Sequence, residues 1–93
     1  MLHEISYWRR WYLKSAYNGN KIAQNNLGIY YYYDKGTYKN EKKAFERYMK
    51  SAIAGYAEGQ CNLGFCYENG IGTIKDNKKA FEWYSRYLKM EMR

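Results

Sequence analysis

The sequence contains no proline among its 93 residues. Proline interrupts helix interiors and central strands, so its absence fits a chain made mostly of helices joined by glycine-marked turns. The sequence also lacks an apolar run long enough for a signal peptide or a membrane-spanning helix. We therefore expect a protein without a membrane segment, located in the cytoplasm.

Histidine and cysteine are scarce, which restricts the chemistry available. His3 is the only histidine, and Cys61 and Cys66 lie five residues apart without a CxxC spacing. A zinc site therefore lacks ligands, and two thiols more than one helical turn apart cannot form an undistorted disulfide. No Ser–His or Cys–His arrangement is available. We expect reduced cysteines, no metal, no cofactor and no catalysis.

Lysine and arginine outnumber aspartate and glutamate by 16 to 9, which gives a formal charge of +7. This balance raises the question of a nucleic acid or an anionic surface as partner. The sequence has no block of five like charges, however, and a glutamate follows each of the Lys42-Lys43 and Lys78-Lys79 pairs three residues later. The pattern favours solvated helix surfaces on which opposite charges alternate.

The chain contains an internal repeat with an offset of 36 residues. The stretch 43–52 returns in part as residues 79–86, and its second half occurs upstream as residues 11–16. A fixed period in this range indicates a repeat protein, in which no helix pair can bury its apolar face alone and stacking builds the core.

Apolar residues spaced three and four apart predict five helices, joined by short turns. Asn40 and Asp76 are the expected N-caps, and Gly55 is expected to end a helix. Gly28 and Gly64 recur in helix interiors, where glycine is unfavourable, so we expect a close approach of a neighbouring helix there. The predicted helices span residues 2–17, 21–33, 41–54, 58–69 and 77–90.

These helices predict an all-α protein, an α-solenoid of stacked antiparallel helix pairs with about five helices and no strand. A chain of this length forms one domain. The expected order within the domain 1–93 is a half repeat formed by an outer helix (2–18), a repeat (20–55) and a repeat with an atypical end (56–91).

The first predicted helix has no partner helix before it. Its Trp8 and Trp11 would therefore form an exposed apolar edge. Two explanations stay open: the sequence is a piece of a longer array, or the edge is covered by another chain, including a second copy.

The repeated residues resemble the Sel1-like repeat, a relative of the tetratricopeptide repeat (TPR), over nearly the whole chain. The first full copy has Leu27-Gly28, Tyr31, Gly36, Lys43-Ala44, Tyr48, Lys50-Ser51-Ala52 and Gly55. The second has Leu63-Gly64, Tyr67, Gly70-Ile71-Gly72, Asp76, Lys79-Ala80 and Trp83-Tyr84. The resemblance implies a right-handed, TPR-like solenoid that serves as an adaptor, holding partner proteins in a superhelical groove, and is not a catalyst.

The resemblance also implies which helices form the groove, because the first helix of each pair lines the concave side in TPR-type stacks. Positions two residues either side of Leu27 and Leu63, and those one turn further, should face across this groove. An apolar, aromatic stripe edged with amides suits a peptide segment. The alternative is that Ile29 and Phe65 only pack against neighbouring repeats. The expected partner-binding residues are Asn25, Ile29, Tyr32, Tyr33, Cys61, Phe65, Glu68 and Asn69.

The sequence is therefore compatible with two functions. The favoured one is a protein–protein interaction scaffold or adaptor that binds a protein or peptide through its concave face. The alternative is a basic, tyrosine-rich module that binds single-stranded nucleic acid or another acidic partner, with a basic row at Lys14, Lys50 and Arg86. The Gly70-Ile71-Gly72 stretch is interpreted as a turn between helices, because no strand precedes it and no Gly-Lys-Ser/Thr follows it.

Overall fold

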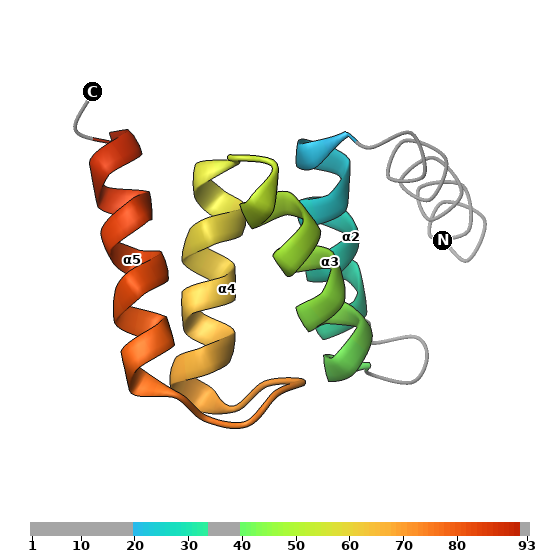
Figure 1. Ribbon diagram of the computed structural model, residues 1–93. Coiled ribbons are helices and arrows are strands. Elements are labelled where there is room, and N and C mark those ends of the chain that lie inside the picture. Colours follow the sequence, from blue (N-terminus) through green and yellow to red (C-terminus); the bar gives the residue numbers. More distant parts are fainter. Residues whose placement is uncertain (1–19, 34–39, 92–93) are drawn as a thin grey trace.

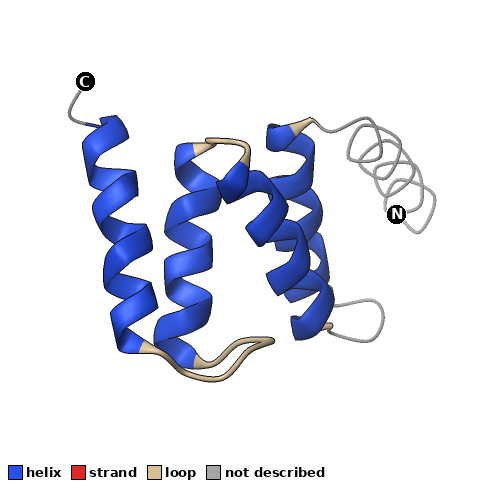
Figure 2. Ribbon diagram, in the orientation of Figure 1, coloured by secondary structure: helices blue, strands red, loops and turns tan. Residues whose placement is uncertain are grey.

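The structure is a computed structural model that describes residues 20–33 and 40–91 (Figure 1). Within these ranges the chain is helical and contains no strand (Figure 2). The predicted helix at 2–17, with Trp8 and Trp11, lies outside the described residues. The other four predicted helices are confirmed within one residue at each end. They are α2 (Lys21–Tyr33), α3 (Glu41–Ile53), α4 (Ala57–Asn69) and α5 (Asn77–Glu91).

The helices form two pairs that stack side by side. Helix α2 packs along α3, α4 packs along α5, and contacts between α3 and α4 join the pairs (Figure 1). Helices α2 and α4, which hold equivalent positions in successive pairs, contact each other more sparingly. This arrangement confirms the expected stack of antiparallel helix pairs.

The two pairs close through the same hydrogen bonds. The backbone N–H of Asn40 donates to the carbonyl of Tyr31 at 3.0 Å, and Asn40 Oδ1 accepts from the N–H of Lys43 at 2.9 Å. The side chain therefore caps α3 as its position predicts. The second pair repeats both bonds at the residues 36 positions later, which are Tyr67, Asp76 and Lys79.

Gly28 and Gly64 allow a tyrosine ring of the outer helix to lie directly on the inner helix. A Cβ atom at Gly28 would lie 2.6 Å from two ring carbons of Tyr48, and one at Gly64 would lie 2.7 Å from the ring of Tyr84. Real Cβ atoms essentially never approach so closely, so a side chain at either position would have to displace the tyrosine ring. The expected close approach is confirmed, and the approaching group is an aromatic side chain.

The hydrophobic core runs as a row through both pairs. Leu27 and Leu63 are fully buried at its centre, while α5 contributes only Ala80 to it. The loop between α4 and α5 closes one end: its Ile71 is buried, and Gly72 lies against the carbonyl of Glu41 in the first turn of α3 (Figure 1). The core residues are Ala23, Leu27, Tyr31, Ala44, Tyr48, Ala52, Leu63, Cys66, Tyr67, Ile71 and Ala80.

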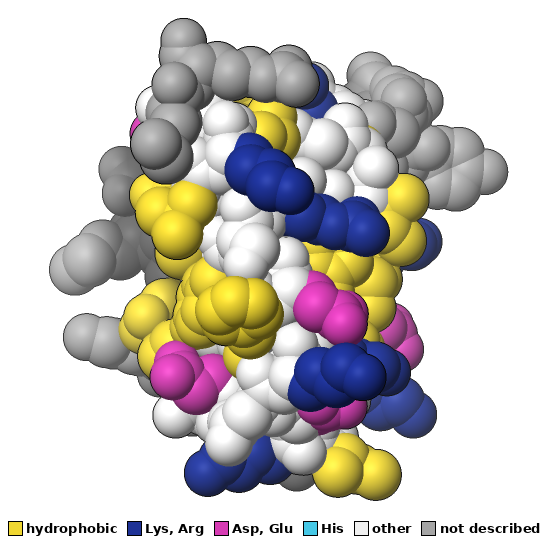
Figure 3. All heavy atoms as spheres, turned by 60° about the vertical axis from the view of Figure 1, so that its left-hand side comes forward, with side chains coloured by type: hydrophobic (Ala, Val, Ile, Leu, Met, Phe, Trp, Pro, Cys, Tyr) yellow, Lys and Arg dark blue, Asp and Glu magenta, His cyan; other side chains and the backbone are white. Residues whose placement is uncertain are grey.

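The surface on the α5 side carries hydrophobic, basic and acidic side chains (Figure 3). Basic side chains form small groups there, with hydrophobic, acidic and other side chains between the groups (Figure 3). No helix of the described part of the chain is both long enough and apolar enough to span a bilayer.

Candidate functional site

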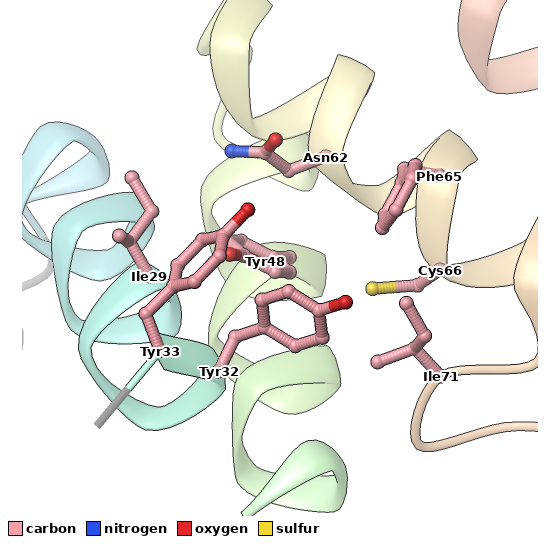
Figure 4. A pocket seen from close by; sticks show the side chains of 8 residues that line it. All are labelled: Ile29, Tyr32, Tyr33, Tyr48, Asn62, Phe65, Cys66 and Ile71. Atoms are coloured by element: carbon pink, nitrogen blue, oxygen red, sulfur yellow. The ribbon is translucent and has the colours of Figure 1, made fainter. Parts of the chain in front are cut away.

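A pocket of about 200 Å³ opens between α2 and α4, where the two helix pairs meet (Figure 4). Helix α2 forms one side, α4 and the loop after it form the opposite side, and the ring of Tyr48 on α3 lies between them. This volume is below the usual range of small-molecule pockets and suits a single large side chain. The lining residues are Ile29, Tyr32, Tyr33, Tyr48, Asn62, Phe65, Cys66 and Ile71.

The rim of the pocket exposes apolar and aromatic side chains to solvent. Tyr33 is 62% exposed, Phe65 is 42% exposed and Ile29 is 37% exposed. The ring of Tyr32 lies edge-on to two other rings. Its centroid is 4.6 Å from that of Tyr33 and 6.3 Å from that of Phe65. Because the second contact crosses from α2 to α4, it sets the two sides of the pocket relative to each other. The rim is thus an ordered aromatic surface left open to solvent.

Four of the eight sequence-predicted residues meet in this pocket. Ile29, Tyr32 and Tyr33 come from α2 and Phe65 comes from α4, as the helical spacing anticipates. Tyr32 and Phe65 pack against each other across the groove. This contact agrees with the alternative that Phe65 packs against the neighbouring repeat. Ile29 and Phe65 nevertheless keep more than a third of their surface exposed, so packing between repeats does not use them fully.

Asn25 does not face the open groove. It is only 4% exposed, and its Oδ1 accepts a hydrogen bond from Asn62 Nδ2 at 2.8 Å. This bond joins α2 to α4 between the two repeats. Sequence reasoning missed Asn62, although the recurrence of asparagine at positions 26 and 62 was a signal that could have directed attention to it.

The other three predicted residues lie outside the pocket. Glu68 and Asn69 are exposed near the end of α4, and Cys61 is half-buried at its beginning. Glu68 Oε1 accepts a hydrogen bond from the Tyr84 hydroxyl at 2.9 Å, and Asn69 Nδ2 donates to the carbonyl of Phe65 at 3.0 Å. By the 36-residue offset, these three residues take the places of Asn25, Tyr32 and Tyr33, and we call this equivalent set in the second repeat the second position.

The second position corresponds to the pocket by the 36-residue offset. Phe65 takes the place of Ile29, and Tyr84 takes the place of Tyr48. Glu68 and Asn69 replace two tyrosines, so an aromatic position is followed by a polar, acidic one.

Sequence reasoning treated Tyr48 as a core residue and did not select Cys66 or Ile71 for the groove. All three are buried, yet they form the floor of the pocket. Burial, assisted by the charge of Glu41, raises the pKa of the Cys66 thiol to about 12. Burial also raises the pKa of Tyr48, with smaller contributions from Cys66, Tyr33 and Tyr32. Both groups are therefore neutral near pH 7, and neither is an activated nucleophile.

The lining of the pocket consists of apolar, aromatic and amide side chains. None of its lining residues carries a charge. Across the described ranges, Cys61 and Cys66 are free thiols and no group of three metal-binding side chains comes together. The pocket can bury an apolar group and form hydrogen bonds through the Asn62 amide and tyrosine hydroxyls.

The repeat periodicity has a counterpart among known families. The Sel1 repeat matches residues 9–20, 21–56 and 57–86. The chain belongs to the Sel1 repeat family. Sel1 repeats are generally protein–protein interaction modules, a scaffold type of fold that is not catalytic in general.

Solved structures of Sel1 repeat proteins are similar to this chain in fold and sequence. A Sel1 repeat protein from Oxalobacter formigenes is 38% identical, with a TM-score of 0.82 over 87% of this chain and 33% of its own. The protein c5321, described as a protective antigen present in uropathogenic Escherichia coli strains and displaying an SLR fold, is 33% identical. Its TM-score is 0.83 over 88% of this chain and 18% of its own.

The Sel1 repeat chain spans a third or less of the length of these two proteins. A search of curated proteins gave no match. The pocket lies between Ile29, in the repeat matched at 21–56, and Phe65, in the repeat matched at 57–86, so both repeats are needed to form it.

Proposed function

We propose that this Sel1 repeat chain is a protein-interaction scaffold that binds a peptide segment of a partner in the groove between α2 and α4. The observation that carries the proposal is the exposed aromatic rim of a pocket built from two repeats. Large exposed aromatic and aliphatic groups are costly in water and are typical of binding hot spots, which cluster around a desolvated centre.

The size and lining of the pocket favour a peptide over a metabolite. About 200 Å³ accommodates one anchoring side chain, and the uncharged walls would desolvate an apolar one at little cost. The Asn62 carboxamide lies in the wall, where its oxygen can accept a bond from the main chain of the segment. The remaining predicted residues, Cys61, Glu68 and Asn69, would contact the segment further along the groove.

The nucleic-acid alternative receives less support. Its basic row requires Lys14, which lies outside the described residues, together with Lys50 and Arg86 on outer helices. The Arg86 guanidinium lies over the ring of Trp83 on its own helix at 4.6 Å. The basic side chains on the α5 side form small groups with apolar and acidic side chains between them, and not one continuous row (Figure 3). Single-strand binding would need a continuous basic groove with stacking aromatics.

Two further predictions belong with this proposal. The free thiols Cys61 and Cys66 agree with a reducing compartment such as the cytoplasm, which stays a prediction. Self-association through Trp8 and Trp11 also stays a prediction, because both residues lie outside the described ranges.

A peptide selection tests the proposed function. The chain is immobilised, and peptides are selected from a displayed random library. The double variant Tyr33→Ala/Phe65→Ala should bind the selected peptides at least tenfold more weakly, because hot-spot truncation costs on the order of 1–4 kcal/mol. Far-ultraviolet circular dichroism checks that helicity is retained.

A matched control removes two apolar groups that are more exposed than Tyr33 and Phe65 and lie away from the groove. Phe81 is 73% exposed on α5 and Ile74 is 86% exposed in the preceding loop. The variant Ile74→Ala/Phe81→Ala should bind the selected peptides as the original chain does. Selection of no peptide, or equal losses in both double variants, would contradict the proposal.

A further inference from the structure

The charge of this protein is distributed unequally between its inner and outer helices. The inner helices α2 and α4 together hold one basic residue, Lys21, and two acidic ones, Glu58 and Glu68, a net charge of −1. The outer helices α3 and α5 each hold four basic and two acidic residues, a net charge of +2 on each. The basic character of the whole chain therefore does not extend to the helices that form the groove.

The first charged residue after the rim residue Phe65 on α4 is a carboxylate. Glu68 is exposed and lies one helical turn after Phe65, which forms the rim. The Tyr84 hydroxyl donates to its Oε1 at 2.9 Å and so restrains the side chain. A carboxylate has about four lone-pair sites, so this bond leaves room for a cationic partner. The restraint also lowers the entropy lost when such a partner binds.

The distance between the pocket and Glu68 corresponds to one step of the repeat, because Glu68 takes the place of Tyr32 by the 36-residue offset. Helices in contact lie roughly 10 Å apart, and an extended peptide advances about 3.3 Å per residue. A side chain that reaches Glu68 would therefore belong to a residue about three positions from the one in the pocket.

Resting on the function proposed above, we infer that the groove recognises an extended peptide with a large apolar residue in the pocket and a lysine or arginine about three residues away, paired with Glu68. The carboxylate of Glu68 disfavours an acidic residue at the same place. The bound peptide thus carries a basic residue near its apolar anchor, although the protein itself is strongly basic.

Charge complementarity is what favours a basic peptide segment over a neutral or an acidic one. The apolar pocket accepts an anchor from an acidic, neutral or basic segment, because its lining has no charged group. Glu68 then discriminates between them, since a like charge brought beside its carboxylate is repelled and a cationic one is attracted.

Synthetic peptides test this inference. Nine-residue peptides with capped ends carry one phenylalanine in a neutral Gly/Ser/Asn background and a lysine, glutamine or glutamate three residues before or after it. Dissociation constants are measured by fluorescence anisotropy at low and high salt. In one orientation, the lysine peptide should bind about fivefold more tightly than the glutamate peptide at low salt, with a smaller ratio at high salt.

Three variants identify the responsible group. Glu68→Lys should reverse the preference, and Tyr84→Phe, which keeps the carboxylate, should retain it. The control Glu46→Lys changes the net charge equally on an exposed position of outer helix α3 and should leave the preference as it is. A preference that shifts equally in both charge-reversed proteins would overturn the inference, because only the overall charge would then be at work.

The outcomes separate the inference from the function on which it rests. A control peptide carries alanine in place of the phenylalanine. If the phenylalanine peptides bind no better than this control, the proposed peptide-binding function fails. If phenylalanine peptides bind and their affinity is the same for lysine, glutamine and glutamate, or is highest for glutamate, the function stands and the inference is wrong.

Discussion

Tyr48 and Tyr84 hold the same place in the two full repeats but differ in their surroundings. Each ring lies on an inner-helix glycine, Gly28 or Gly64. Tyr48 is 4% exposed because α4 of the next repeat covers it, whereas Tyr84 is only half-buried and has no following helix in the described part of the chain. The burial of a repeat position is therefore decided as much by the neighbouring repeat as by its own sequence.

A second pair of equivalent positions differs in hydrogen bonding. In the first repeat, Arg47 Nη1 donates to Gln24 Oε1 at 3.4 Å. In the second, Trp83 replaces the arginine, and Oε1 of the buried Gln60 has no hydrogen-bond partner. Gln60 Nε2 still donates to the carbonyl of Ala52 at 3.3 Å. The two repeats share one backbone arrangement, yet the side-chain oxygen of the equivalent glutamine accepts a hydrogen bond in the first repeat and none in the second.

The largest difference should come from adding a methyl group under each tyrosine. Gly28→Ala should lower the free energy of unfolding by about 2 kcal/mol, because Tyr48 is enclosed, even after the gain in helix propensity. Gly64→Ala should cost about 1 kcal/mol or less, because Tyr84 can rotate towards solvent. Urea unfolding followed by circular dichroism measures both values. Equal losses would show that the neighbouring repeat does not confine Tyr48.

A smaller effect is expected from the buried thiol that faces the pocket. Below about pH 9, Cys66 is protonated in both the folded and the unfolded chain, so its burial carries no penalty. Above pH 9, the unfolded thiol ionises first, so stability falls until the folded pKa of about 12 is reached. The loss is at most about 1.4 kcal/mol per pH unit. Thermal unfolding at pH 8, 9 and 10 measures it.

The variant Cys66→Ala tests the origin of this pH dependence. It should lose less stability between pH 8 and pH 10 than the original chain, each compared with its own value at pH 8. Cys61→Ala should change the slope less, because Cys61 is only half-buried. An unchanged slope in Cys66→Ala would assign the effect to other groups, such as Tyr48.

The smallest expected difference concerns the two glutamines. Gln60→Met removes a buried oxygen that has no partner, together with one long hydrogen bond, and should change the stability by less than about 0.5 kcal/mol. Gln24→Met removes the acceptor of Arg47 and should cost about 1 kcal/mol. Parallel urea titrations give the two values, and a greater cost at Gln60 would contradict the proposed asymmetry.

Local signals in the sequence were sufficient for the helices. The caps at Asn40 and Asp76 and the spacing of apolar residues placed each described helix within one residue. Such features depend on neighbours within one or two turns, which a sequence displays directly. The repeat offset then indicated how the helices stack, because equivalent residues must make equivalent contacts.

The pocket was only half predictable because it forms between repeats. Ile29 and Phe65 could be found from their positions relative to the buried leucines. Tyr48 is part of the repeated scaffold, and nothing local indicates that its covered ring also forms the floor of a pocket. Asn25 was placed in the groove by spacing alone, whereas its bond to Asn62 depends on how closely α4 approaches α2.

Among the described helices, α5 packs against α4 alone, and it contributes no residue to the pocket. It can therefore open by local unfolding while α2, α3 and α4 keep the pocket lining in place. In amide hydrogen exchange, α5 should lose its protection first. A peptide bound in the pocket should slow exchange in the three other helices more than in α5. Helix α5 would then be the most labile of the four described helices, and its lability would leave the pocket intact.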